Sequence, residues 1–337
     1  MPVTDFQNYL ENNSQRISQM VNDFFEHPAN PDIRQYLYQP LADFTANGGK
    51  RHRPLICELA CLAVGGDAAR VKSAAAAIEH FHTAALIHDD IADESELRRG
   101  EPCLYKLIGP GLAINAGDLA LSQVTGLVVN DAVLDNATKI RVLDELVQMT
   151  TRTIEGQALD LGWVRDGRFD LTIDDYLLMA TLKTAHYSGG TPLAVGAIIG
   201  GGNVQQIAAL RAYGIAAGLA FQIQDDLLNL VGTPNLLHKD FRNDITEGKR
   251  TLMAIHAIQN SGQALELIAL LNAHSTDPVV QARAVEIMEQ SGSLAFAHHL
   301  ALKLVQEAQA GLPHFIAASP YRDLLSSMAD FFVERLN

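Results

Sequence analysis

Hydrophobic residues recur at three- and four-residue steps along most of the chain, which is the period of an amphipathic α-helix. Near the start, Phe6, Leu10 and Ile17 follow this spacing and predict a helix over residues 5–26. No stretch alternates apolar and polar residues for long enough to predict a sheet. The other segments expected to be helical are 33–46, 55–64, 68–90, 113–134, 139–157, 176–188, 207–230 and the remainder, 252–337.

Glycine and proline mark where the expected helices stop. Pro40 interrupts or restarts the second segment, and Gly48-Gly49 precede the third. The glycine-rich run 189–202 predicts flexible turns around a short apolar helix. Neither a linker nor a shift in composition divides the sequence, so we expect one all-α domain over residues 1–337.

The composition is typical of a helical protein with an aliphatic core. Of the 337 residues, 48% are hydrophobic but only 6% are aromatic. A net charge of −14 argues against a nucleic acid partner, because the phosphate backbone attracts basic surfaces. No apolar run approaches the roughly 18–20 residues of a membrane span, so no span is expected.

The N-terminus and the cysteines predict a cytoplasmic protein. The first seven residues lack the basic and apolar regions of a signal peptide. Cys57, Cys61 and Cys103 do not make a disulfide framework. Cys57 and Cys61 share a helix face and could form a metal pair, but reduced core cysteines are the expectation.

Three aspartates lie where a long, alanine-rich apolar segment ends. Asp89 and Asp93 are four residues apart and share one helix face, whereas Asp90 lies about 100° round from Asp89. Like charges this close repel each other unless a cation lies between them, and Mg²⁺ prefers carboxylate and phosphate oxygens. Arg98 and Arg99 follow, and their guanidinium forks suit phosphate oxygens. Together these residues predict a diphosphate site, although the motif alone is more typical of a solvated helix end.

A second carboxylate cluster favours the diphosphate interpretation. Asp225, Asp226 and Asn229 again end a long apolar helix, at positions i, i+1 and i+4. The loop that follows carries Lys239 and Lys249. Two oxygen-rich clusters, each followed by basic residues, would make a symmetric cation clamp around one polyanion.

Further cations lie in the loop 48–54, Gly-Gly-Lys-Arg-His-Arg-Pro, which enters a helix N-terminus. Basic side chains and free backbone N–H groups there make a ready anion site, and an ordinary charged loop is the alternative. His82 lies seven residues before Asp89 and shares its helix face. Lys183-Thr184 interrupts an otherwise apolar helix, where a buried lysine is costly enough to need a reason.

These motifs resemble, in order and spacing, those of the trans-polyprenyl diphosphate synthases. The resemblance spans roughly residues 48–251. It rests on the basic loop at 48–54, Asp-Asp-x-x-Asp with Arg-Arg-Gly at 89–100, Lys-Thr at 183–184, Gln-x-x-Asp-Asp at 222–226 and Asn-Asp-x-x-x-Gly-Lys-x-Thr at 243–251. Five motifs in the right order make an accidental match very improbable.

The resemblance implies a bundle of ten or more helices around a deep central cavity, usually as a homodimer. It implies Mg²⁺-dependent, head-to-tail condensation of isopentenyl diphosphate with an allylic diphosphate to an all-trans polyprenyl diphosphate. Diphosphate leaves only once its charge is neutralised, and loss of it gives an allylic carbocation that the isopentenyl double bond attacks. No protein nucleophile is needed for this reaction.

The resemblance also divides the site residues into groups. Ligands for three magnesium ions per active site, which bridge the allylic diphosphate, would be Asp89, Asp93 and Asp225. The same diphosphate would be enclosed by Arg98, Lys183 and Lys249, and the carbocation stabilised by Thr184 and Gln222. Isopentenyl diphosphate would be bound without metal by Lys50, Arg53, His82 and Arg99, while Lys239 matches the basic residue of the loop after the second cluster.

One position departs from the family pattern. Asn229 stands where many members carry a third aspartate. Its amide offers a carbonyl oxygen but no charge, so Asp225 is expected to hold most of the metal at this cluster.

Product length in such enzymes depends on how deep the cavity runs below the first carboxylates. Ala84 and Ala85 are small where short-chain enzymes often place an aromatic floor. Phe81, about one turn deeper, could be the floor instead, or could pack into ordinary core. A floor at Phe81 predicts a product of geranylgeranyl length or slightly longer.

Three other functions compete with this one. A terpene cyclase or a head-to-head coupling enzyme also uses aspartate-rich helices, but would not need the basic loop at 48–54. A non-catalytic subunit of a heteromeric synthase would be expected to lack carboxylates or arginines that are present here. A helical scaffold protein would leave Lys183 and both carboxylate clusters unexplained.

Overall fold

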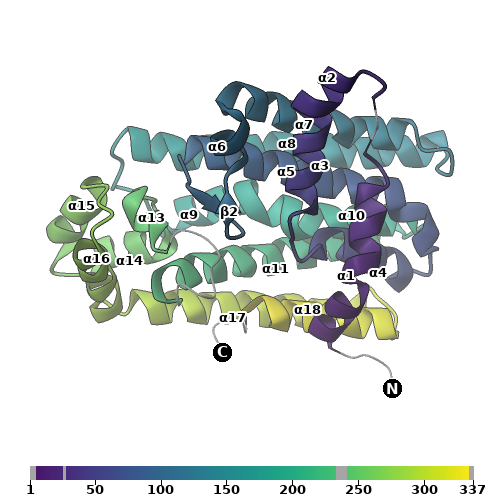
Figure 1. Ribbon diagram of the computed structural model, residues 1–337. Helices are drawn as coiled ribbons and strands as arrows, with labels where there is room; N and C mark the ends of the chain where they lie inside the picture. The colour runs from purple at the N-terminus through teal and green to yellow at the C-terminus, as the bar shows by residue number, and fades with distance from the viewer. Residues whose placement is uncertain (1–4, 26–27, 233–240, 334–337) are drawn as a thin grey trace. The chain divides into compact units, whose positions relative to one another are not determined.

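The computed structural model describes residues 5–25, 28–232 and 241–333, and most of this part of the chain is helical (Figure 1). Its contacts group into two compact units. One contains Met1–Thr150, Tyr187–Gly214 and Gly311–Met328, and the other contains Thr151–His186, Ile215–Ala310 and Ala329–Asn337. The expectation of a single domain over residues 1–337 stays a prediction.

The first unit contains the N-terminal helices and the hairpin that follows the first carboxylates. Its elements are α1 (Phe6–Asn22), α2 (Pro31–Ile33), the π-helical η1 (Arg34–Tyr38), α3 (Gln39–Ala46), α4 (His52–Ala63), the 3₁₀ turn η2 (Ala68–Val71), α5 (Lys72–Ala92), β1 (Leu97–Arg98), β2 (Glu101–Pro102), α6 (Leu104–Ile108), α7 (Pro110–Val129), α10 (Thr191–Ile199) and η4 (Leu312–His314).

The second unit holds the helices around the second carboxylates. Its elements are α9 (Ile173–Ala180), α13 (Asn243–Thr246), α14 (Leu252–Asn260), α15 (Ala264–Asn272), α16 (Pro278–Gln290) and most of α17 (Ser293–Gly311). The chain passes from one unit to the other within α8 (Asn136–Arg165), the π-helical η3 (Thr181–Gly190), α11 (Val204–Val231) and α18 (Pro320–Val333).

Local sequence explains where several helices begin. The Asp5 carboxylate caps α1 by accepting the N–H of Gln7 at 2.9 Å. Thr172 and Asp175 form a reciprocal capping box at the start of α9. At α16, Asp277 caps the first turn and Pro278 occupies it, where the missing N–H costs nothing.

Helix α5 positions the first carboxylates by packing against α7, beside which it lies (Figure 1). The contact is built mainly of small residues, including Ala84, Ala113, Ala116 and Ala120. Small side chains let the two backbones approach closely. Gly117 instead makes room for a side chain of α5, the imidazole of His88. A Cβ there would lie 2.2 Å from His88 Nε2.

Two glycines of residues 189–202, Gly189 and Gly196, lie in helices rather than in the expected turns. Gly189 lies inside η3, and a Cβ on it would come within 2.0 Å of the Gly214 carbonyl oxygen. Helix α10, which was expected, is buried along its whole length, and Gly196 lies against the backbone of Cys57 in α4. Gly189 and Gly196 therefore serve close packing between helices, which the sequence pattern alone does not distinguish from a role in turns. Gly201, by contrast, lies in a turn after α10, with φ +79° and nothing within 4 Å of a Cβ.

A two-stranded hairpin was not expected from the sequence. β1 and β2 pair antiparallel, with Leu97 opposite Pro102, and are too short to show alternation. Arg99 and Gly100 form the turn with φ angles of +57° and +82°. This hairpin brings Arg98 and Arg99 back beside α5.

Helix α7 also differs from the expectation about membrane spans. Among the described residues it is the helix that is long and apolar enough to cross a membrane, with a mean hydropathy of 1.4 over its best window. Asp118 is the charged residue that interrupts it. Of the residues in that window 33% are buried in the protein, and the exposed residues of α7 include polar Asn115, Asp118 and Ser122 as well as apolar Ile114 and Val129.

Candidate functional site

In the first carboxylate cluster, the three aspartates face different surroundings. Asp90 is buried, and Arg98 Nε donates to its Oδ1 at 2.7 Å. Burial raises the pKa of Asp90, and the adjacent Arg98 guanidinium opposes that rise. Asp89 and Asp93 stay partly exposed on the last turn of α5. In this cluster, Asp90 is therefore the buried carboxylate, and Asp89 and Asp93 are the partly exposed ones.

The basic loop between α3 and α4 carries two predicted anion-binding residues with different exposure. Lys50 is exposed, whereas Arg53 is buried. Arg53 Nη2 donates to Ser188 Oγ at 2.8 Å and to Tyr187 Oη at 3.3 Å. Its guanidinium carbon also lies 4.7 Å from the centre of the Tyr187 ring, a cation–π contact.

His82 also contacts Tyr187. Its ring is stacked near that of Tyr187, with centroids 5.9 Å apart. Burial, reinforced by the charges of Arg53 and Arg99, lowers the pKa of His82 well below its usual value. Arg53 and His82 are thus brought together around Tyr187, as a predicted anion site requires.

Arg99, also predicted to bind anion, contacts the basic loop itself. Its Nη1 donates to the carbonyl oxygens of Asn47 at 3.0 Å and Gly48 at 2.7 Å. Burial and the neighbouring Arg51 lower the pKa of Arg99 to about 10. Gly49 lies against the Arg99 guanidinium and has φ +112°, a left-handed conformation that favours glycine.

The residues predicted to set product length lie in the interior of the first unit. Phe81 is buried and meets Tyr187 edge to face, with ring centroids 5.7 Å apart. Ala84 is buried against α7, and Ala85 is partly exposed. Phe81 and Ala84 therefore point into different surroundings.

In the second unit, a chain of hydrogen bonds connects two predicted catalytic residues to Asp226. Thr184 Oγ1 donates to Gln222 Oε1 at 2.6 Å, and Gln222 Nε2 donates to Asp226 Oδ1 at 2.6 Å. Tyr176 Oη completes the chain by donating to Asp226 Oδ2 at 2.7 Å. Burial and the neighbouring Asp244 raise the pKa of Asp226 to about 8. Asp225, one position earlier, is partly exposed.

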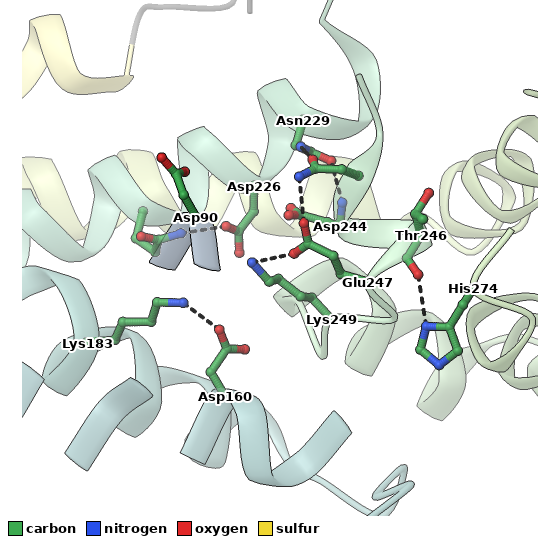
Figure 2. Close-up of polar contacts among 12 residues, drawn as sticks. Asp90, Asp160, Lys183, Asp226, Asn229, Asp244, Thr246, Glu247, Lys249 and His274 are labelled. Carbon is green, nitrogen blue, oxygen red and sulfur yellow. Dashed lines mark hydrogen bonds and ion pairs between the residues drawn. The ribbon is translucent and has the colours of Figure 1, made fainter. Parts of the chain in front are cut away.

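Asn229, the residue that departs from the family pattern, forms hydrogen bonds that link α11 to α13. Its Nδ2 donates to Asn243 Oδ1 at 3.1 Å, and its Oδ1 accepts the N–H of Asp244 at 3.3 Å (Figure 2). An aspartate could accept the second of these bonds but could not donate the first. The amide at this position therefore has a structural partner.

The predicted lysines of the second unit are each held by a carboxylate. Lys183 Nζ lies 2.5 Å from Asp160 Oδ2, and Lys249 Nζ lies 2.6 Å from Glu247 Oε2 (Figure 2). The buried Asp160 is the charged partner that a lysine in an apolar helix requires. Lys239 lies outside the described residues.

A further contact secures the segment that carries Glu247 and Lys249. The Thr246 carbonyl oxygen lies 2.9 Å from His274 Nδ1 (Figure 2). Thr246 Oγ1 donates to the Ser275 carbonyl oxygen at 3.1 Å and accepts from Gln281 Nε2 at 2.9 Å. The start of α16 and the turn before it thus hold this segment in place.

Tyr187 and Tyr176 were missed by sequence reasoning. Tyr187 lies four residues after Lys183 in η3, a spacing that could have placed it on the same helical face. Tyr176 lies 50 residues from Asp226, and nothing in its local sequence indicates that contact.

Comparisons with known proteins agree with one another. Residues 34–288 match the family model described as polyprenyl synthetase. The short chain isoprenyl diphosphate synthase of Methanothermobacter thermautotrophicus is 41% identical over 290 residues, which cover 86% of this chain and 87% of that one. The geranylfarnesyl diphosphate synthase of Natronomonas pharaonis is 36% identical over 304 residues, 86% of each chain.

A solved structure is similar over nearly the whole chain. Geranylgeranyl pyrophosphate synthase from Corynebacterium glutamicum, complexed with isoprenyl diphosphate and magnesium, has a TM-score of 0.88 at 30% identity and covers 98% of this chain and 99% of that one. The predicted all-α fold of the isoprenoid synthase type is confirmed by this likeness.

Proposed function

The chain belongs to the polyprenyl synthetase family, and we propose that it condenses isopentenyl diphosphate head-to-tail with an allylic diphosphate. It is a prenyl transferase, as the family and its relatives indicate. The expected allylic substrates are dimethylallyl, geranyl and farnesyl diphosphate, and the expected product is an all-trans polyprenyl diphosphate.

The observation that carries this proposal is the pair of buried side chains next to Tyr187, those of Arg53 and His82. Arg53 Nε and His82 Nδ1 have no hydrogen-bond partner within the described part of the chain. Buried polar atoms are normally satisfied, so these two are suited to a ligand that supplies acceptors. We assign Arg53 and His82, with Lys50 and Arg99, to the diphosphate of isopentenyl diphosphate.

The carboxylates fit magnesium by their chemistry. Mg²⁺ is commonly held by one or two carboxylates together with substrate phosphates. Among the described residues, no three acidic, histidine or cysteine side chains form a complete metal site by themselves. Asp89, Asp93 and Asp225, all partly exposed, are the proposed ligands, for three ions per active site. The chemistry that magnesium supplies is neutralisation of the diphosphate charge, which makes it a better leaving group.

The protein's own side chains are proposed to act on the charge that moves during the reaction. The C–O bond of the allylic diphosphate breaks, and Arg98, Lys183 and Lys249 stabilise the negative charge of the departing diphosphate. The oxygens of Thr184 and Gln222, oriented by their shared hydrogen bond, stabilise the allylic cation. The isopentenyl double bond then forms the new C–C bond, and a proton passes to the departing diphosphate.

A product assay tests the function directly. Purified protein is incubated with Mg²⁺, isopentenyl diphosphate and, separately, each allylic diphosphate, and the dephosphorylated alcohols are identified by mass spectrometry. We expect successive addition of isoprene units. Release of cyclic hydrocarbon instead would indicate a terpene cyclase, and inactivity with every primer would indicate a non-catalytic subunit.

Product length is proposed to be limited at Phe81. Its ring is buried and fixed against Tyr187, so it can end a cavity rather than swing aside. We expect a geranylgeranyl or slightly longer product from the wild type and longer products from Phe81→Ala, measured in the same assay. Ala85→Phe, at a partly exposed position nearer Asp89, should shorten the product. Unchanged product length in both variants would show that the residue that limits product length does not lie on α5.

A homodimer and a cytoplasmic location are also proposed. Helix α8 exposes Ile140, Val147, Ile154 and Leu161 by 68%, 53%, 60% and 38%. Their seven-residue spacing keeps them on one face, as at a helix–helix seam. An apolar stripe of this kind is suited to a second copy of the chain.

The three buried, unpaired cysteines support a reducing compartment.

A further inference from the structure

The basic loop at residues 48–54 contains an arginine that is placed unlike its neighbours. Arg51 is the N-cap of α4 and has a left-handed backbone, with φ +52°. Its side chain is 2% exposed, so it is withdrawn from solvent while Lys50 beside it is exposed. Arg51 is therefore directed into the protein.

The partner of Arg51 is Glu79, in the middle of α5. Arg51 Nη1 lies 2.7 Å from Glu79 Oε1, and the Glu79 side chain is also 2% exposed. Arg51 Nη2 donates to the Thr45 carbonyl oxygen, near the end of α3. One guanidinium thus joins α3, the start of α4 and α5 at the loop.

The charges around this pair are mostly positive. Arg51 and Arg53 both act on Arg99, lowering its pKa, while Glu79 acts in the opposite sense. The same arginines lower the pKa of His82. Without the Glu79 carboxylate, repulsion among the cations would favour movement of Arg51, and the loop with it, toward water.

Fold stability alone is a weak reason for this ion pair. Buried ion pairs often contribute no more than apolar residues of similar volume, because both charges must be desolvated. Here Glu79 Oε2 and Arg51 Nε have no hydrogen-bond partner within residues 5–25, 28–232 and 241–333, which makes the pair less favourable still. What the pair does achieve is a fixed position for the loop.

We propose that Glu79 is a positioning residue for isopentenyl diphosphate binding. It holds Arg51, and through Arg51 it holds the loop in the arrangement that presents Lys50 and Arg53 to the diphosphate. This inference rests on the proposed function, because the substrate is the one assigned there to the loop. Glu79 does not touch the substrate in this proposal.

Two variants separate positioning from stability. Glu79→Gln keeps the shape and removes the charge. The double variant Arg51→Met/Glu79→Leu removes both charges and leaves neither buried alone. Glu58→Gln is the matched control, because the Glu58 carboxylate is also buried in the same unit but pairs with Arg16 of α1, at 2.7 Å, rather than with an arginine of the loop.

The measurements are the steady-state constants for both substrates and calorimetric binding of isopentenyl diphosphate in the presence of a chelator. In Glu79→Gln we expect the KM and Kd for isopentenyl diphosphate to rise about tenfold or more, the loss of one charge-assisted hydrogen bond. The KM for the allylic substrate should stay within about twofold. The double variant should unfold near the wild-type temperature yet keep the weak isopentenyl diphosphate binding.

Other results would overturn the inference. Wild-type isopentenyl diphosphate binding in Glu79→Gln would do so, and so would full recovery of binding in the double variant. An equal rise of both KM values would indicate general damage to the fold rather than loop positioning. Wild-type protein that neither binds nor consumes isopentenyl diphosphate would overturn the proposed function itself, a result independent of the comparison between variants.

Discussion

At the scale of single residues, the two carboxylate clusters are alike. In each, one of two adjacent aspartates is buried and hydrogen-bonded, and the other is partly exposed. In the first cluster Asp90 is buried and bonded to Arg98, while Asp89 is partly exposed. In the second, Asp226 is buried and bonded to Tyr176 and Gln222, while Asp225 is partly exposed. Because adjacent helical residues point about 100° apart, one carboxylate of each pair turns inward while the other stays partly exposed.

The hydrogen bond from Tyr176 to Asp226 gives a first prediction. Tyr176→Phe removes this donor, so Asp226 is less firmly held and Gln222 and Thr184 lose part of their orientation. We expect kcat to fall about tenfold, equivalent to about 1.4 kcal/mol, while the KM for isopentenyl diphosphate is unchanged. Steady-state kinetics with one allylic primer measure both constants.

Tyr213→Phe is the control for that experiment. Tyr213 is also buried, and its hydroxyl donates to the Leu325 carbonyl oxygen. The variant Tyr213→Phe should lower the unfolding temperature without lowering kcat. A kcat loss of equal size in both variants would show that the Tyr176 effect comes from stability rather than from the orientation of Gln222.

The buried histidines of α5 give a prediction about pH. Burial lowers the pKa of His80, whose Nδ1 lies 2.7 Å from Gln123 Oε1, and that of His82 is lowered in the same direction. In the unfolded chain both protonate near the ordinary value of 6.5, so below this pH the unfolded state binds more protons. The free energy of unfolding should therefore fall as pH decreases below 6.5.

Denaturant unfolding of wild type and His80→Gln over about pH 5 to 7.5 checks this. Each histidine contributes a slope of at most about 1.4 kcal/mol per pH unit, so the variant should show the shallower dependence. Equal slopes for the two proteins would show that His80 keeps its ordinary protonation in the fold.

At the scale of elements, glycines decide how closely the helices can pack. Helix α10 is buried on all sides, and Gly196 lies where its backbone meets that of α4. A Cβ at Gly196 would lie 2.0 Å from the Cys57 carbonyl oxygen, so neither backbone has room for a methyl group. The position of α4, which follows the basic loop, depends on this contact.

Gly196→Ala is expected to lower the free energy of unfolding by about 2 kcal/mol or more, because packed cores resist added volume. Denaturant unfolding measures the loss. Gly126→Ala in α7 is the control, since nothing lies within 4 Å of a Cβ there. It should be neutral or stabilising by about 0.5–1 kcal/mol, the helix propensity gain of alanine over glycine. Similar losses in both variants would contradict the packing argument.

At the scale of the whole molecule, the apolar stripe of α8 bears on how the chain assembles. The four residues of the stripe recur every seven positions and are exposed in a chain of net charge −14. Exposed apolar residues at regular spacing on one helix face are typical of an interface.

A measurement of the oligomeric state tests whether the α8 stripe forms a dimer interface. Light scattering during size-exclusion chromatography should report a dimer for wild type and a monomer for Ile140→Glu/Val147→Glu, because two charges would be buried at the seam in each copy. Val279→Glu, at an exposed valine of α16, should leave the mass unchanged. A wild-type monomer would contradict the proposal.

The local pattern of the sequence determined the class of the fold and the placement of the motifs. Helical periodicity acts over a few residues, so the segments that became α1, α5, α8 and α11 were each predicted, apart from their ends. The i, i+1, i+4 spacing likewise placed Asp89 and Asp93 on one face of α5 without any knowledge of its neighbours. Residue chemistry at fixed helical spacing is a local property.

Only the tertiary structure decided which partner each polar group has. Asp226 meets Tyr176 across 50 residues, and Arg53 meets Ser188 across 135. Gly189 and Gly196 are sites of close packing, since Gly214 and Cys57 of distant segments lie against them. Such contacts depend on how distant helices pack, and a pattern that is read over one helix at a time carries no information about its neighbours.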